Sequence, residues 1–401
     1  MTPEIRFDGF KGNWNIDTLD ILTDVYDGTH QTPLYENSGI MFLSVENIKT
    51  LTSKKYISEK AFYSDFNVFP QKGDVLMTRI GDIGTANIVE SDKPVAFYVS
   101  LALLKKKSLD PYFLKAVISS EAVWRELWHR TLHIAFPKKI NVNEIKRVPV
   151  NYPTDENEQA AIGNFFRTID DMITLKKQQY GQTKNIKKAM LEKMFPKKGA
   201  DAPEIRFDGF TGAWKERIIG DVAVFSKGNG YSKADLTDCG IPIILYGRLY
   251  TKYETVIDDV DTYTILKANS VISLGGEIIV PSSGETAEDI ARASVVVKSG
   301  VVLGGDLNIV SADKTIDPIF LALTISNGAP QRELSKKAQG KSVVHIRNSD
   351  LKEIRLPVPD VKEQTAIGNF FRSLDALIEA QLEELKKLKN IKKACLSKMF
   401  V

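Results

Sequence analysis

The sequence lacks the features that mark membrane proteins and disulfide-rich secreted proteins. Only two of its 401 residues are cysteine, and Cys239 and Cys395 have neither a disulfide pattern nor metal-ligand spacing. No hydrophobic run approaches the roughly 18 residues of a transmembrane helix. The opening stretch MTPEIRFDGF contains no apolar signal region. We therefore expect a cytoplasmic protein that has no membrane partner.

Motifs for cofactor and phosphate chemistry are also missing. Residues 81–84 read GDIG with no dinucleotide-type helix after them, and no G-x-x-x-x-G-K-[ST] motif occurs. The Asn-Pro-Pro-aromatic type of motif that an adenine methyltransferase needs is absent too. His129 and His133 lie four residues apart, but without a third ligand we expect them to be structural or exposed. The sequence therefore predicts no catalytic residue, metal site or cofactor site in this chain.

The charge is almost balanced, with 54 basic and 51 acidic residues and a net charge of +3. Charge alone therefore does not indicate nucleic acid, and any basic surface must be local. A hydrophobic content of 43% is ordinary for a globular protein. The length predicts two or three domains.

One long segment occurs twice. EQAAIGNFFRTIDDMITLKKQQYGQTKNIKKAMLEKMF, at 158–195, returns as EQTAIGNFFRSLDALIEAQLEELKKLKNIKKACLSKMF, at 363–400. Apolar residues recur at three- and four-residue steps, which predicts one long coiled-coil helix in each copy. About 40 residues would span roughly 60 Å, so we expect these helices to act as spacers.

Both predicted helices begin acidic and end basic, an order that suits the helix macrodipole. Antiparallel packing would place the basic end of each helix beside the acidic start of the other. The middle of the first helix, 176–185, is polar and contains Gly181, so it needs a partner. We expect an antiparallel pair with a pseudo-two-fold axis, and we expect Asp170 and Asp171 on a solvated face.

A second repeat marks the starts of the domains. PEIRFDGF occurs at 3–10 and again at 203–210, and the long segments that follow have diverged in sequence. We predict two mixed domains, 1–152 and 199–358, and two helical regions, 153–198 and 359–401. The predicted fold class is α+β: two mixed α/β domains separated by two long antiparallel coiled-coil helices, in a pseudo-two-fold internal repeat.

Short apolar runs between turn residues predict the strands of the two mixed domains. The first domain has such runs at 40–45, 75–79, 86–89 and 99–104, followed by a helical pattern at 110–127. The second has runs at 241–245, 270–274, 278–280, 293–297 and 307–311, followed by a helical pattern at 317–325.

Taken together, these residues resemble the specificity (S) subunit of type I restriction–modification systems. The resemblance covers the whole chain. It depends on the E-Q-x-A-I-x-x-F-F helices and on three further stretches: KGDVLMTRIGDIG at 72–84, INVNEIKRVPV at 140–150 and IRNSDLKEIRLPVP at 346–359.

The resemblance implies that each mixed domain is a target recognition domain reading one half of a split site in double-stranded DNA. It implies that the helices separate these domains and dock two methyltransferase subunits, through which restriction and translocase subunits join. S-adenosylmethionine, ATP and Mg²⁺ would then be bound by the partner subunits, and this chain would have no catalytic activity. For the docking contacts the resemblance points to Phe165, Phe166, Phe370 and Phe371.

Loops supply the candidate DNA contacts. The polar residues of 27–33 can donate and accept hydrogen bonds at base edges, although an ordinary polar turn is the alternative. The basic residues near Trp124 and Trp128 could form a basic face, or these tryptophans could pack inward. The candidates of the first domain are Thr29, His30, Gln31, Thr32, Arg79, Lys138 and Lys139. Those of the second are Arg248, Ser282, Ser283, Thr286, Lys341 and Ser342.

Rival interpretations remain at this point. The chain could be an enzyme in its own right, which the missing cofactor motifs oppose. It could be a coiled-coil adaptor that binds only protein, which the unlike inserts on a repeated frame oppose. It could also be the DNA-recognition part of another methyltransferase or nuclease system.

Overall fold

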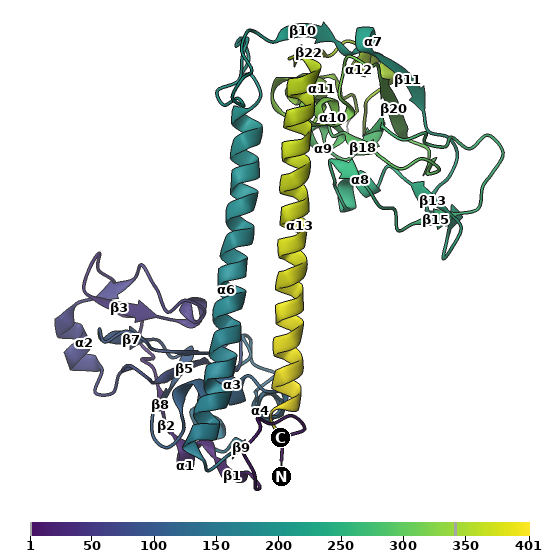
Figure 1. Ribbon diagram of the computed structural model, residues 1–401. Helices are drawn as coiled ribbons and strands as arrows, with labels where there is room; N and C mark the ends of the chain where they lie inside the picture. Colours follow the sequence, from purple (N-terminus) through teal and green to yellow (C-terminus); the bar gives the residue numbers. More distant parts are fainter. Residues whose placement is uncertain (1, 341–342) are drawn as a thin grey trace. The chain divides into compact units, whose positions relative to one another are not determined.

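The computed structural model describes residues 2–340 and 343–401. Contacts divide the chain into two units, which we call unit 1 (1–178 with 383–401) and unit 2 (179–382). Each unit contains one PEIRFDGF segment, one mixed domain, the start of one long helix and the end of the other (Figure 1).

The two long helices are α6 (Glu156–Lys193) and α13 (Val361–Lys398), each of 38 residues. A straight helix of that length spans about 57 Å. Within unit 1, Lys392 of α13 pairs with Asp170 of α6, and Lys176 lies 2.9 Å from Glu384. These pairs require antiparallel helices, as the charge order predicts.

The same ion pair recurs in unit 2. Lys187 of α6 pairs there with Asp375 of α13, and the shift of 205 residues between the repeats turns Asp170 and Lys187 into Asp375 and Lys392. The internal repeat is therefore present in the contacts as well as in the sequence. Asp170 is not on a solvated face as expected, because Lys115 and Lys392 enclose its carboxylate and leave the side chain 26% exposed.

Unit 1 is built on two small sheets, which pack together through the hydrophobic cluster that contains Phe42 and Leu76. The first is antiparallel, in the order β2-β8-β5-β6, and the second has the order β4-β3-β7, with β3 and β7 parallel. A separate pair, β1 with β9, joins the two ends of the domain. The strands are β1 (Asn15–Thr18), β2 (Asp24–Asp27), β3 (Ile40–Leu43), β4 (Tyr56–Ile57), β5 (Val75–Thr78), β6 (Ala86–Ile88), β7 (Val95–Phe97), β8 (Leu101–Lys105) and β9 (Pro149–Tyr152). The helices are α1 (Leu19–Leu22), η1 (Val45–Asn47), α2 (Glu59–Asp65), α3 (Pro111–Ile118), α4 (Glu121–His129) and α5 (Val142–Lys146).

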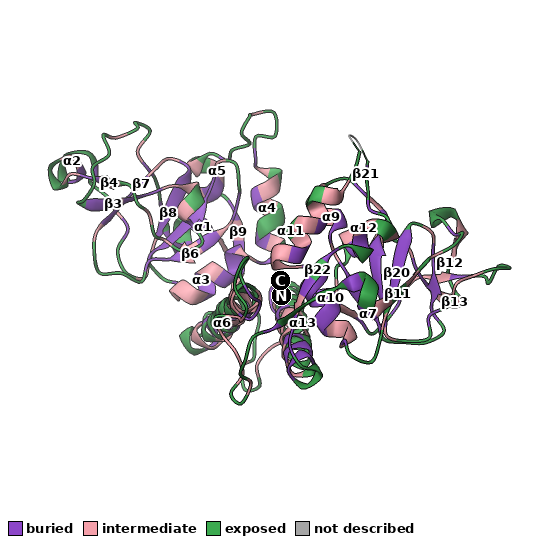
Figure 2. Cartoon of the chain, turned by 90° about the horizontal axis from the view of Figure 1, so that it is seen from above, coloured by how far each residue is buried: buried purple, intermediate pink, exposed green. Residues whose placement is uncertain are grey.

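Unit 2 repeats this plan with one more strand in each of the two sheets. Its main sheet has the order β11-β20-β16-β18-β14, and the second has the order β12-β15-β13-β19, with β13 and β19 parallel. Its strands are β10 (Lys215–Ile218), β11 (Ala223–Lys227), β12 (Leu236–Thr237), β13 (Ile241–Ile244), β14 (Val256–Ile257), β15 (Tyr263–Thr264), β16 (Glu277–Pro281), β17 (Ser283–Gly284), β18 (Ser294–Val296), β19 (Val302–Leu303), β20 (Leu307–Ala312), β21 (Val344–His345) and β22 (Arg355–Val358). Its helices are α7 (Ile219–Val222), η2 (Lys233–Asp235), α8 (Arg248–Thr251), α9 (Ala287–Ile290), α10 (Pro318–Ile325), α11 (Gly328–Lys337) and α12 (Asn348–Lys352). Figure 2 shows buried residues concentrated on elements such as β20 and α10.

Most predicted elements are present, but two predictions are wrong. The helix expected over 110–127 is two helices, because Ser120 caps α4 by accepting a hydrogen bond from Val123 N at 3.3 Å. The run 270–274 forms no strand. Ile272 makes only an isolated bridge to Val302, and Leu274 is 86% exposed.

The repeated residues hold the frame of each unit together. Arg6 donates to both carboxylate oxygens of Glu158, at 2.6 and 2.7 Å, and Trp14 Nε1 donates to the same carboxylate at 3.3 Å. Arg206 and Glu363 form the same two bonds at 2.6 and 2.7 Å in unit 2. Hydrogen bonding to Glu158 raises the pKa of Arg6.

The next residues of the repeat dock each long helix against the mixed domain. Gln159 accepts a hydrogen bond from Asp110 N at 2.9 Å and donates to Pro153 O at 2.8 Å. Gly163 follows, and a Cβ there would lie 2.6 Å from the carboxylate of Asp110, which caps α3. Any larger residue would therefore push α3 away from α6.

The end of each long helix closes the core in which the other helix begins. Phe400, after α13, packs against Phe166 of α6 with ring centroids 5.6 Å apart in unit 1. Phe195, after α6, packs against Phe371 of α13 at 6.1 Å in unit 2. Each hydrophobic core is therefore assembled from two distant parts of the chain.

We predict that Glu158→Ala lowers the free energy of unfolding of unit 1 by about 3–5 kcal/mol, because the half-buried Arg6 loses its carboxylate and the buried Trp14 Nε1 loses its acceptor. Amide hydrogen exchange should accelerate in peptides of unit 1 and stay unchanged in unit 2, and Glu363→Ala should show the reverse. Glu156→Ala, an exposed position at the start of α6, is the matched control. Equal acceleration in both units would contradict this account.

Candidate nucleic-acid interface

Three segments of unit 1 meet beyond the end of β5. They are the loop that follows β2, the residues that follow β5, and the segment that leads into α5. Ile140 N donates to Arg79 O at 3.0 Å, and Gly81 N donates to Lys138 O at 2.8 Å. Main-chain bonds therefore fix two of these segments against each other, and they bring together most of the predicted contacts of the first domain.

Arg79 joins the third segment to the other two. Its guanidinium donates to Asp27 Oδ1 at 2.5 Å, to Val99 O at 2.9 Å and to Ile140 O at 3.0 Å. Arg79 is only 5% exposed. The prediction that Arg79 lies on the surface and contacts DNA is therefore wrong. Its side chain is buried, and its hydrogen bonds hold the three segments in position.

The loop at 27–33 presents its polar side chains to solvent. Asp27 accepts from Arg79 and lies 2.9 Å from His30 Nε2. Thr29 exchanges main-chain bonds with the end of β7, since Thr29 N donates to Phe97 O at 3.2 Å and Val99 N donates to Thr29 O at 3.0 Å. His30, Gln31 and Thr32 are exposed and Thr29 is half-buried.

Two residues that matter here were missed by sequence reasoning. A Cβ on Gly28 would lie 2.5 Å from Tyr98 O, and a Cβ on Gly228 would lie 1.9 Å from Gly304 O. Only glycine permits this approach to the neighbouring chain. The signal was available, because Gly28 and Gly228 are separated by 200 residues, the offset of the PEIRFDGF repeat.

Unit 2 repeats the main-chain pattern with different side chains. Ile346 N donates to Ser282 O at 3.0 Å, as Ile140 N does to Arg79 O. Gln339 N donates to His345 O at 3.1 Å, as Leu132 N does to Lys139 O at 2.7 Å. The stretches that begin at Ile140 and Ile346 therefore occupy equivalent places in the two units. Of the predicted contacts here, Lys341 and Ser342 lie outside the described residues.

The remaining predicted contacts of unit 2 differ in access. Ser283 is half-buried and its Oγ lies 3.2 Å from His345 Nδ1. Ser282 is only 6% exposed, so it is not a surface contact as predicted. Thr286 is the N-cap of α9, where its Oγ1 accepts from Asp289 N at 3.0 Å.

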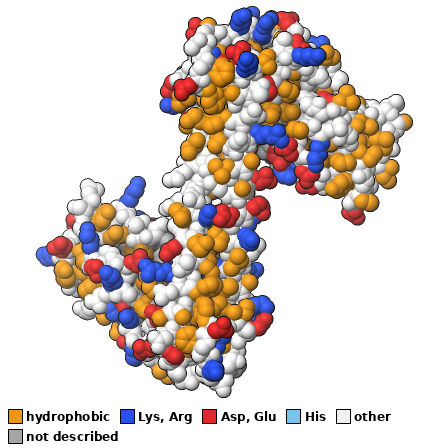
Figure 3. Space-filling model, viewed as in Figure 1, with side chains coloured by type: hydrophobic (Ala, Val, Ile, Leu, Met, Phe, Trp, Pro, Cys, Tyr) orange, Lys and Arg blue, Asp and Glu red, His pale blue; other side chains and the backbone are white. Residues whose placement is uncertain are grey.

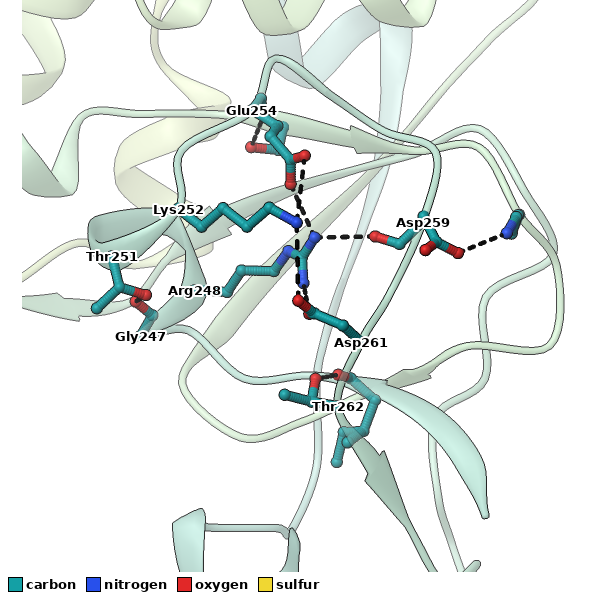
Figure 4. Close-up of polar contacts among 11 residues, drawn as sticks. Gly247, Arg248, Thr251, Lys252, Glu254, Asp259, Asp261 and Thr262 are labelled. Carbon is teal, nitrogen blue, oxygen red and sulfur yellow. Dashed lines mark hydrogen bonds and ion pairs between the residues drawn. The ribbon is translucent and has the colours of Figure 1, made fainter. Parts of the chain in front are cut away.

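Arg248 lines a cavity of 1120 Å³ in unit 2, together with Tyr246, Tyr250 and Ser283. Its side chain is 8% exposed and donates to Glu254 at 2.8 Å, to Asp261 at 2.7 Å and to Asp259 O at 2.8 Å (Figure 4). The cation is therefore neutralised within the protein. The prediction of Arg248 as an available DNA contact does not fit this arrangement.

The basic face predicted near the tryptophans is smaller than expected. Arg125 pairs with Glu121, and Arg130 pairs with Glu126 and Glu144. The two tryptophan rings stack on each other with centroids 5.4 Å apart. Lys138 and Lys139 are exposed, and within the described part of the chain neither has an ion-pair partner.

The phenylalanines assigned to docking are core residues. Phe166 and Phe371 are 3% and 0% exposed. Phe165 and Phe370 are half-buried against Phe7 and Phe207, each at 5.7 Å between ring centroids. The prediction that they bind another subunit is therefore wrong for the buried Phe166 and Phe371. For the half-buried Phe165 and Phe370 it stays a prediction.

The described residues contain no cluster of three or more His, Cys, Asp or Glu side chains that could hold a metal ion. Among the helices of the described chain, none is long and apolar enough to cross a membrane.

Comparison with known proteins agrees with this architecture. The type I restriction modification DNA specificity domain matches residues 26–185 and 212–390. The chain is 23% identical over 347 residues to the specificity subunit assigned to the type I restriction enzyme MjaX of Methanocaldococcus jannaschii, covering 80% of this chain and 76% of the relative. It is also 23% identical over 261 residues to the MjaVIII specificity subunit of the same organism, covering 59% and 57%.

A solved structure has the same fold along its whole length. The type I restriction–modification S subunit from M. genitalium superposes with a TM-score of 0.68 at 16% identity, covering 100% of this chain and 99% of that one. The predicted fold class is therefore confirmed. With the family match in both units, the chain belongs to the type I restriction modification DNA specificity family.

Proposed function

We propose that each unit reads one half of a bipartite sequence in double-stranded DNA on behalf of a methyltransferase complex. The observation that carries the proposal is the repeated three-segment surface. Two of its main-chain bonds recur in both units, while the side chains differ: Arg79 is replaced by Ser282 and Lys139 by His345. A common scaffold with unlike side chains suits two readers of different sequences.

The exposed residues of unit 1 have suitable chemistry. Gln31 and Thr32 can exchange hydrogen bonds with base edges in the major groove. Lys139 is exposed on the segment that leads into α5 and suits a phosphate oxygen. In unit 2, Ser283 and His345 occupy the corresponding region.

The outer faces of the long helices offer a docking surface in place of the buried phenylalanines. Met172 and Leu377 are 43% and 47% exposed, and Ile186 and Ile391 are 48% and 41% exposed. Both pairs are related by the 205-residue offset of the repeat (377 − 172 and 391 − 186). Unit 1 therefore carries Met172 with Ile391, and unit 2 carries Leu377 with Ile186. Figure 3 shows hydrophobic side chains among the charged ones along the helices.

Two equivalent apolar surfaces suit two copies of one partner, which we take to be the methyltransferase subunit. In this proposal the methyltransferase subunits bind S-adenosylmethionine and perform the chemistry. Restriction subunits that use ATP and Mg²⁺ join through them. This chain supplies the sequence specificity and no catalytic residue.

The test of sequence reading is an exchange of one domain. Replacing residues 19–148 with the same region of another family member keeps the β1–β9 pair and the Arg6–Glu158 pair. Methylome sequencing of cells that carry the exchange should show one altered half-site and one unchanged half-site. The purified complex with the methyltransferase subunit should transfer methyl groups to DNA. This chain alone should transfer none. A change in both half-sites, or methyl transfer by this chain alone, would sink the proposal.

We expect Lys139→Ala to weaken binding to all DNA sequences and to lower the salt slope of binding by about one, because a phosphate contact carries little sequence information. The measurement is a salt titration of DNA affinity with the assembled complex. Lys93→Ala, an exposed lysine on the turn before β7, is the matched control. A loss confined to one DNA sequence would assign Lys139 to a base edge instead.

For docking, we expect Met172→Lys to remove one methyltransferase subunit and the double variant Met172→Lys/Leu377→Lys to remove both, because each buries a charge in an apolar contact. Native mass spectrometry of the copurified complex counts the subunits. Leu274→Lys, at a side chain 86% exposed in unit 2 and away from the helices, is the control. A double variant that keeps two methyltransferase subunits would place the docking surface elsewhere.

A further inference from the structure

The loop between α4 and α5 carries two large hydrophobic side chains entirely in water. We call residues 132–139 the apolar loop. Ile134 is 99% exposed and Phe136 is 104% exposed, the highest values among the large hydrophobic side chains of the described chain. Leu132, at the base of the loop, is 40% exposed. Scattered exposed hydrophobic residues are ordinary, but two neighbouring residues with no contact area at all indicate a missing partner.

The apolar loop is anchored at its base to the three-segment surface. Leu132 N donates to Lys139 O at 2.7 Å, and Lys139 forms a second bridge with Ile80. Lys138 O accepts from Gly81 N, and Lys138 Nζ lies 4.6 Å from the centre of the Trp128 ring. The tip therefore projects from the same scaffold that positions the polar loop at 27–33.

The charge around the tip is positive. From Leu127 to Asn143 the chain contains no acidic residue, whereas it contains five basic or potentially basic ones: His129, Arg130, His133, Lys138 and Lys139. Glu126 and Glu144 neutralise Arg130, and Lys138 and Lys139 have no ion-pair partner in the described chain. An apolar tip beside two cations that lack an ion-pair partner is complementary to a base step and its phosphate backbone.

The size of the tip also favours DNA over a protein. A stable protein interface buries about 1,000 Å² or more, so two side chains could supply only a small part of one. An apolar wedge that opens a base step needs only one or two side chains, commonly Phe, Leu, Ile or Met.

We propose that Phe136 and Ile134 form an apolar wedge that enters a base step at or beside the half-site read by unit 1 and unstacks it. This inference rests on the proposed DNA-reading function and adds a deformation of the DNA to it. Specificity at that step then depends on how easily the step unstacks, so flexible pyrimidine–purine steps are favoured.

Unit 2 lacks an equivalent wedge in the described part of its loop. The corresponding residues there are Gln339, Gly340, Val343, Val344 and His345, and the only exposed large hydrophobic side chain among them is Val343, at 49%. The deformation is therefore expected at one half-site and not at the other.

The experiment uses the assembled complex with its methyltransferase subunits and a duplex carrying the target identified by methylome sequencing. Adenines in and beside each half-site are replaced one at a time by 2-aminopurine, whose fluorescence rises when it is unstacked. Wild type should raise the fluorescence at one step, on the unit 1 side. The double variant Phe136→Ser/Ile134→Ser should abolish that rise and weaken binding by roughly 5- to 150-fold, the range expected for one lost aromatic–base stack. The single variant Phe136→Trp should keep both the fluorescence rise and the binding affinity of the wild type.

Tyr63→Ser is the matched control, because Tyr63 is an aromatic residue 65% exposed on α2 of the same unit. Unchanged fluorescence and affinity in the double variant would overturn the wedge while leaving DNA reading intact. Loss of the methyltransferase subunits from the double variant would also overturn it, because the tip would then be a protein contact. If the wild-type complex shows no preference for the target, the proposed function itself fails, and the wedge fails with it.

Discussion

The fold depends on the closure of each hydrophobic core by the end of a helix that began in the other unit. Phe400 fills the core around Phe166, and Phe195 fills the core around Phe371. Neither unit can complete its core from its own mixed domain alone, since the closing residues directly follow the end of a 38-residue helix. This requirement explains why the KMF ending is repeated, and why the polar middle of α6 is tolerated: the ends of the helices are fixed by core packing.

The same requirement explains why the residues of the frame are repeated in both units while those of the exposed loops differ. Glu158, Gln159 and Gly163 each contact a different part of the frame, namely Arg6, Asp110 N and the start of α3. Substitution at any of them would loosen the junction between helix and mixed domain. The loops beyond β5 and β16 are held mainly through main-chain bonds, which accept almost any side chain. The frame can therefore stay constant while the exposed surface changes.

The repeats made the architecture predictable from the sequence, because a repeated helix, its polarity and its charge order are all linear patterns. The polar loop at 27–33 could be predicted as exposed for the same reason. The burial of individual cations could not be predicted from the sequence. Arg79 and Arg248 appear as free arginines in the sequence, but their partners, Asp27 and Asp261, are brought beside them only by folding. Phe166 and Phe371 were misassigned because an apolar helix face does not reveal whether it meets its own domain or a second protein.

The divergence between the two units extends beneath their surfaces. Ile140 O accepts from Arg79 Nε in unit 1, whereas the equivalent Ile346 O accepts from Asn308 Nδ2 in unit 2, at 3.0 and 2.9 Å. Asp27, the partner of Arg79, faces Ala102 across its sheet, while the matching residues in unit 2 are Lys227 and Asn308. Two buried positions and one exposed position therefore differ together, while the same carbonyl stays satisfied. A graft of the exposed residues alone would separate such sets and leave buried polar groups unpaired, which costs about 1–3 kcal/mol for each group. Recognition by these surfaces is thus a property of a whole domain, and it should transfer between proteins only when the whole domain is exchanged.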